Sequence, residues 1–277
     1  MGAPSTRIPA DLLERGHAVV EEQEAIARRL EGDRKGWFAV AYAAVTRHEL
    51  GHIFGGRYAH PAMKLREVVC FHHAWAANLA AWERGDTGAV EPHWQVALSR
   101  AESAGREQAL CRVMPSVCVR EALLPSVEAH VRLDLPRAVV QAHRSLRQAE
   151  GGGLPLRAFR EDFFRMQGVF ALATADIGAS IARRGRPWDP GSWRWVQRRR
   201  FDADFDLPAE RRLVWEKAVL VADALRRGLG VHEADACLRR ALPARHPGLA
   251  PFAVAGWELP VLDWYRRFCD EPCPGPG

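Results

Sequence analysis

Apolar residues recur three and four positions apart along most of the chain, which is the spacing of helices with one buried face. In residues 11–31 the apolar positions are Leu12, Leu13, Val19, Val20, Ile26 and Leu30. A second, more apolar helix is predicted over 35–54, where two glycines follow it. Pro61 predicts the start of a third helix that reaches about residue 84.

Helical spacing continues after residue 90. Further helices are expected at 92–105, 107–124, 155–185, 208–229 and 232–242, with an apolar stretch over 126–150, a loop at 186–206 and an irregular tail rich in Pro and Gly at 243–277. No set of alternating strands and no Gly-rich phosphate loop accompanies these segments. We therefore predict one all-α domain over 1–277, a helical bundle with its core at about 11–242.

Composition narrows the class of protein. The 277 residues are 48% hydrophobic, enough for a substantial core, and the net charge of +5 does not require a nucleic-acid partner. No apolar run approaches the ~20 residues that span a bilayer, and the first nine residues lack the apolar segment of a signal peptide. We expect a cytoplasmic protein with reduced cysteines and no membrane span.

A metal-binding pattern lies in the second predicted helix. His48-Glu49-Leu50-Gly51-His52 reads H-E-x-x-H, which places two imidazoles on one helix face. Zinc held there would leave Glu49 as general base on a bound water, as in zinc metallopeptidases, which this segment resembles locally. Zinc is the one cofactor that this interpretation implies, and the sequence implies no other firmly.

The zinc interpretation needs a third ligand. An extended form of the motif requires histidine at position 58, where this chain has Tyr58, and His60 comes two residues later. Glu67 is the remaining candidate ligand, on the following helix. Zinc peptidases also place a mixed sheet beside this helix, and no strands are predicted. The competing interpretation is that His48 and Glu49 belong to the solvated end of an amphipathic helix.

A second polar centre lies among apolar residues. His130 and Asp134 are four residues apart, so on a helix they share a face, and Pro136 is expected to end or kink that helix. Asp134 could orient His130 as an acid or base, or both could bind a metal. The structural alternative is a buried His–Asp hydrogen bond that joins two helices.

The residues around this pair resemble a known family. Ala129-His130-Val131-Arg132-Leu133-Asp134-Leu135-Pro136 matches the A-H-[IV]-x-x-D-L-P motif of an all-helical bacterial domain of unknown function. Further similar positions are Trp37-Phe38, Tyr42, Tyr58-Ala59-His60-Pro61, Val68 to Phe71, Trp75, Phe163 to Gln167, and Arg212 with Trp215. The resemblance covers about 35–227 and implies an all-helical fold; it supplies no activity.

Arginine and tryptophan alternate in the predicted loop at 186–206. Trp188, Trp193 and Trp195 stand among arginines there, and three aspartates follow. Such a segment could cap the bundle, form a lid over an apolar ligand, or bind single-stranded nucleic acid. We favour the cap.

Three functions follow from these features. The leading prediction is an enzyme that acts on an apolar or mixed-polarity small molecule, a cyclase, lyase or hydrolase of biosynthetic metabolism. His130, Asp134 and Arg132 are its predicted catalytic residues, and the predicted substrate pocket consists of Trp37, Tyr42, Phe71 and Trp75. The alternatives are a zinc metallopeptidase and a non-catalytic binding or scaffold protein. The sequence leaves the oligomeric state open.

Overall fold

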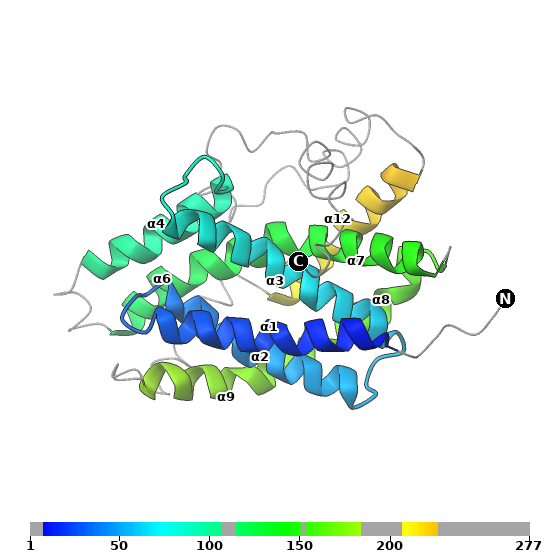
Figure 1. Ribbon diagram of the computed structural model, residues 1–277, viewed down its shortest axis with the longest axis horizontal. Helices are drawn as coiled ribbons and strands as arrows, with labels where there is room; N and C mark the ends of the chain where they lie inside the picture. The colour runs from blue at the N-terminus through cyan, green and yellow to red at the C-terminus, as the bar shows by residue number, and fades with distance from the viewer. Residues whose placement is uncertain (1–7, 107–114, 151–152, 184–206, 227–277) are drawn as a thin grey trace.

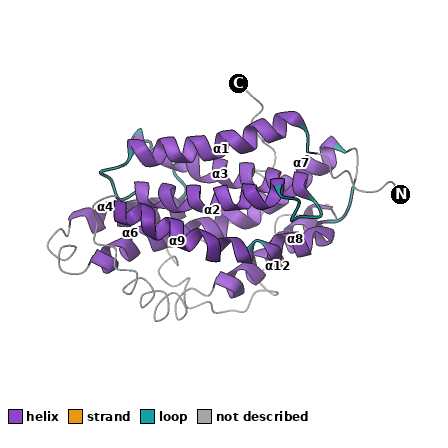
Figure 2. Ribbon diagram, turned by 90° about the horizontal axis from the view of Figure 1, so that it is seen from below, coloured by secondary structure: helices purple, strands orange, loops and turns teal. Residues whose placement is uncertain are grey.

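A computed structural model describes residues 8–106, 115–150, 153–183 and 207–226. These residues form helices and loops, with no strand among them, so the chain is all-α as predicted (Figure 2). The elements are α1 (Ala10–Arg29), α2 (Gly36–Phe54), α3 (Pro61–Glu83), α4 (Pro92–Arg106), α6 (Pro115–Ala129), η1 (His130–Asp134), α7 (Leu135–Ala149), η2 (Leu156–Phe159), α8 (Arg160–Arg165), α9 (Gln167–Arg183) and α12 (Leu207–Arg226). None of the described helices is long and apolar enough to cross a membrane.

The helices form a layered bundle around α2 and α3 (Figure 1). Helix α1 packs on both of these helices, α9 packs on α2, and α7 packs on α3, while α12 covers α7 and α4 pairs with α6. Gly16 lets α1 approach α3 closely, because a Cβ atom at this position would lie 2.5 Å from the Leu65 side chain. The apolar stripe of α1 therefore meets α3 as its spacing predicts.

Proline and glycine set several helix ends. Pro61 begins α3, and α2 ends at Phe54, before Gly55 and a left-handed Gly56 with a φ of 70°. The carboxylate of Asp162 accepts hydrogen bonds from the backbone N–H groups of Ala59 and His60 at 3.0 and 2.7 Å. Asp162, from a distant segment, thus holds the two backbone N–H groups that directly precede α3.

One predicted helix is interrupted. The segment 155–185 was expected to form one long helix, but it contains η2, α8 and α9, with a break at Met166. The buried guanidinium of Arg211 donates a hydrogen bond to the Phe163 carbonyl and lies 3.7 Å from the Met166 sulfur. Because Arg211 satisfies that carbonyl, the helix can break there without leaving the group unpaired.

Other predicted boundaries shift. Helix α6 begins at Pro115 and continues to Ala129, so it overlaps both the predicted helix 107–124 and the stretch 126–150. The predicted loop at 186–206, its arginines and tryptophans, the helix at 232–242 and the tail at 243–277 lie outside the described residues.

The described helices form two hydrophobic cores. One is formed mainly by α1, α3, α7 and α12, and the other by the first half of α2 with the end of α3, α4 and α6. Phe71 of α3 and Val127 of α6 are only partly buried and pack against both cores. Phe71 stacks on His130, one of the predicted catalytic residues.

Candidate functional site

The predicted His130–Asp134 segment forms a π-helical turn between α6 and α7. The Leu135 N–H donates to the His130 carbonyl five residues earlier, and Pro136 follows in the first turn of α7. Proline cannot donate a backbone hydrogen bond, so a wider turn accommodates it without ending the helix. Single π turns inside α-helices are rare and are frequent at functional sites.

His130 is buried in a set of aromatic rings that we call the aromatic shell, which consists of Phe38, Tyr42, Phe71 and Trp94. Phe71 stacks on the imidazole with ring centroids 3.4 Å apart and planes only 5° from parallel. Tyr42 contacts the imidazole edge to face at 4.6 Å, and Phe38 and Trp94 lie at 5.3 and 5.9 Å. The shell removes the imidazole from water, since His130 is 3% exposed.

Asp134 is the centre of a buried hydrogen-bond network. Its Oδ2 atom lies 2.8 Å from Nδ1 of His130 and accepts a hydrogen bond from the Trp94 indole at 3.0 Å. Its Oδ1 atom lies 3.1 Å from Nε2 of His93, and Arg137 is 3.7 Å away. Burial alone would raise the pKa of Asp134, but hydrogen bonds from His130 and His93 lower it below its ordinary value. Asp134 is therefore a carboxylate.

These contacts fix the protonation of His130. A carboxylate can only accept, so the Nδ1 atom facing Asp134 carries the hydrogen. Burial lowers the pKa of His130 to about 4, against the opposite effect of Asp134, so the imidazole is neutral at pH 7. Its Nε2 atom then has a free lone pair, and this atom is buried without a hydrogen-bond partner among the described residues.

Tyr42, whose ring contacts the His130 imidazole, carries a second buried polar atom. The Tyr42 hydroxyl is also buried without a hydrogen-bond partner in the described part of the chain. Burial, with the charges of Asp134 and Glu67, raises the pKa of Tyr42 well above its ordinary value. The phenol therefore stays protonated and can donate a hydrogen bond.

Some of the other residues predicted for this site lie close to His130, and others do not. Phe71 and Tyr42 contact His130 directly, whereas Trp75 contacts Tyr42 and Phe38, which in turn contact His130. Trp37 is buried under the guanidinium of Arg34, 5.6 Å from the ring centroid. Arg132 does not join the His130 cluster: it donates a hydrogen bond to Glu210 of α12 at 2.6 Å and lies 3.8 Å from Glu128.

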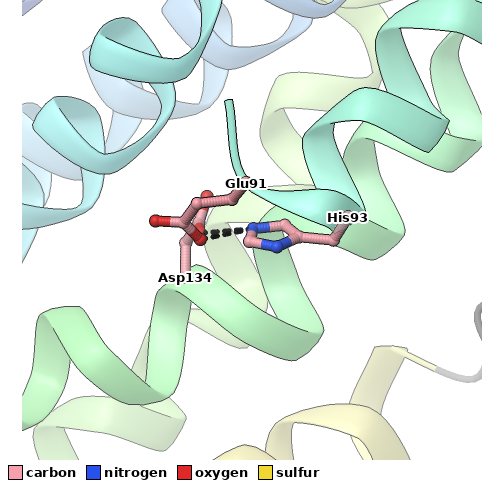
Figure 3. A group of neighbouring side chains, drawn as sticks. All are labelled: Glu91, His93 and Asp134. Atoms are coloured by element: carbon pink, nitrogen blue, oxygen red, sulfur yellow. Dashed lines mark hydrogen bonds and ion pairs between the residues drawn. The ribbon is translucent and has the colours of Figure 1, made fainter. Parts of the chain in front are cut away.

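Three further polar residues lie around Asp134, and no sequence motif singles them out. Glu91 directly precedes α4, and His93 lies in its first turn, with its ring directed at the Glu91 and Asp134 carboxylates (Figure 3). Ligand atoms of Glu91, His93 and Asp134 lie within 4.8 Å of one another, which could accommodate a metal ion. Arg137 binds both carboxylate oxygens of Glu91. The sequence Glu91-Pro92-His93 at a helix start is the only local signal.

The H-E-x-x-H residues point to different partners. His48 pairs with Asp176 of α9 at 2.8 Å, while Glu49 is buried, accepts a hydrogen bond from Tyr58 and lies 3.3 Å from the Lys64 ammonium. Glu67, the predicted third ligand, also binds Lys64, at 2.8 Å. His48, His52 and Glu67 do not gather their ligand atoms within 4.8 Å in the described structure.

The fold and these contacts define an all-helical protein with a buried His–Asp pair at a π turn. The chain belongs to DUF5995, a family of unknown function, whose model matches residues 17–242. Membership of a family of unknown function, predicted over about 35–227, is thereby confirmed. Neither the curated proteins nor the solved structures contain a match to the chain.

Proposed function

We propose that the protein is a cytoplasmic enzyme that uses His130 as a general base on an apolar or mixed-polarity small molecule. The observation that carries the proposal is the geometry of His130: Asp134 holds one ring nitrogen, while the other is buried and has no hydrogen-bond partner among the residues that the structure describes. A purely structural histidine gains its stability when both ring nitrogens are satisfied, because an unpaired buried polar atom costs about 1–3 kcal/mol.

The arrangement supports proton transfer. A C–H or O–H group of a bound molecule would give its proton to Nε2 of His130, and the ring would become an imidazolium while the substrate becomes an anion. Asp134, already hydrogen-bonded at Nδ1, would stabilise that positive charge. The Tyr42 hydroxyl would donate to the developing negative oxygen, in the manner of an oxyanion donor.

The aromatic shell favours apolar substrates. The lone pair of Nε2 lies in the imidazole plane, at the edge of the ring. A substrate that reaches it would enter beside Phe71, the partly buried ring stacked on the imidazole face, and would move Phe71 aside. A lyase, a cyclase or a hydrolase could each begin with this proton abstraction. The aromatic shell and the His130–Asp134 pair thus support proton abstraction from an apolar molecule.

A model reaction tests the base. The probe is 5-nitrobenzisoxazole, an apolar aromatic whose ring opens when a base removes its C–H proton. We expect His130→Gln to reduce the rate at pH 7 by at least about tenfold, since positioned bases typically contribute 10²–10⁴-fold. The exposed His17 on α1 provides the matched control, His17→Gln, which should react like the wild type. Equal rates for the wild type and His130→Gln would contradict the proposal.

The non-catalytic alternative rests on a specific observation, the burial of both His130 and Asp134. If the pair only joins helices, His130→Gln should lower stability and leave probe turnover unchanged. Measuring the urea midpoint of the same variants separates a loss of turnover from a loss of fold.

A further inference from the structure

We propose that Glu91, His93 and Asp134 form a binding site for a divalent transition-metal ion of the Zn²⁺ type. This site goes beyond the proposed proton transfer, although it shares Asp134 with it. The three residues converge from two places in the chain, the start of α4 and the end of the π turn (Figure 3).

The distances around His93 fit ligands of one ion. Its Nε2 atom lies 3.1 Å from Oδ1 of Asp134 and 3.3 Å from Oε2 of Glu91. Metal–ligand bonds of about 2.0–2.2 Å at tetrahedral or octahedral angles place neighbouring ligand atoms about 3.0–3.5 Å apart. Nε2 of His93 hydrogen-bonds to Oδ1 of Asp134, and Arg137 hydrogen-bonds to Oε2 of Glu91. A cation between the three atoms would take the place of the hydrogen on His93 and bind the lone pairs that these contacts leave on the two carboxylates.

The ligands are held by other residues. The Trp94 indole and His130 both bind Oδ2 of Asp134, which leaves Oδ1 toward His93. Arg137 binds the Glu91 carboxylate, and the Glu91 backbone N–H donates to the Asn78 side chain at 2.7 Å. Outer hydrogen bonds of this kind orient the carboxylates of metal sites before the ion binds.

Charge favours a cation here. The site brings two carboxylates into a largely buried place, and Arg137 contributes a single positive charge. The two carboxylates thus face one guanidinium, and a divalent cation bound by His93 and both carboxylates would offset the remaining negative charge. One imidazole and two carboxylates suit Zn²⁺, Mn²⁺ or Fe²⁺ better than Mg²⁺, which prefers oxygen ligands alone.

Calorimetric titration of the chelator-treated full chain with ZnCl₂ tests the site. We expect one equivalent of Zn²⁺ to bind, and His93→Gln to weaken binding at least about tenfold. His17→Gln should bind like the wild type, and MgCl₂ should compete poorly. If the wild type shows no saturable binding, or if His48→Gln removes the binding and His93→Gln does not, the proposal is overturned.

A fold check and a separate measurement of probe turnover accompany the zinc titration. Circular dichroism checks the fold of His93→Gln; if that variant does not fold, Glu91→Gln, which keeps an oxygen for Arg137, must weaken Zn²⁺ binding instead. Probe turnover by the metal-free protein is measured separately. Turnover without metal binding would reject only the metal site, and metal binding without turnover would reject only the proposed base.

Discussion

Lys64 shows how a single side chain can decide between two interpretations of a motif. It is 1% exposed, and its ammonium lies between the carboxylates of Glu49 and Glu67. Both carboxylates are residues of the predicted zinc peptidase site, one as base and one as ligand. In the structure the Lys64 ammonium pairs with both carboxylates, and the Tyr58 hydroxyl donates a hydrogen bond to Oε2 of Glu49.

Replacing Lys64 should therefore be costly. Lys64→Met leaves two buried carboxylates without their cation, and breaking a buried ion pair on one side typically costs about 3–5 kcal/mol in the free energy of unfolding. Urea denaturation measures this loss. The matched control is Arg47→Met, because Arg47 pairs with Glu24 where both side chains are exposed, and such pairs contribute about 0–1 kcal/mol. Similar losses in the two variants would show that the buried network stabilises little.

Among the elements, helix starts and ends follow the sequence closely where proline or glycine marks them, as at Pro61 and Gly55. The break at Met166 could not be predicted, because Arg211, which satisfies the Phe163 carbonyl, stands 48 residues further along the chain. The residues of the candidate site likewise fall into those that the sequence could predict and those that it could not. His130 and Asp134 are local neighbours and visible in the sequence, whereas His93 and Trp94 reach Asp134 only through tertiary packing.

The contribution of Asp162 to the start of α3 can be measured. Asp162→Ala removes the acceptors of the N–H groups of Ala59 and His60, and each such hydrogen bond typically contributes about 0.5–1.5 kcal/mol to the free energy of unfolding. Asp162→Asn keeps one oxygen acceptor and should cost less. Thermal unfolding of both variants measures the difference. Equal destabilisation by Asn and Ala would mean that the hydrogen bonds are not what Asp162 contributes.

Buried histidines make the free energy of unfolding of the protein depend on pH. Burial lowers the pKa of His143 below 6.5, with Arg147 acting in the same direction and the Leu154 carbonyl against it. Below pH 6.5 the unfolded chain therefore binds a proton that the folded chain resists. Stability from this group is complete above pH 6.5 and declines as the pH falls toward the lowered pKa, by at most about 1.4 kcal/mol per pH unit.

The dependence can be assigned to His143. Between pH 7 and 5.5, His143→Gln should show a shallower decline in the free energy of unfolding than the wild type, as measured by urea titration at each pH. His17→Gln, at an exposed position of α1, should keep the slope of the wild type. A slope unchanged in His143→Gln would place the linkage in other groups, such as His73, whose pKa burial also lowers.

Phe71 packs against both hydrophobic cores while it covers His130. Access to His130, as the proposed function requires, would displace this ring and loosen packing on both sides, so we expect a conformation with an open His130 to be a minor population. The affinity measured for any molecule that binds there is its intrinsic affinity multiplied by that population. The protein would then bind preferentially those small molecules that can take the place of the Phe71 phenyl ring between the two hydrophobic cores.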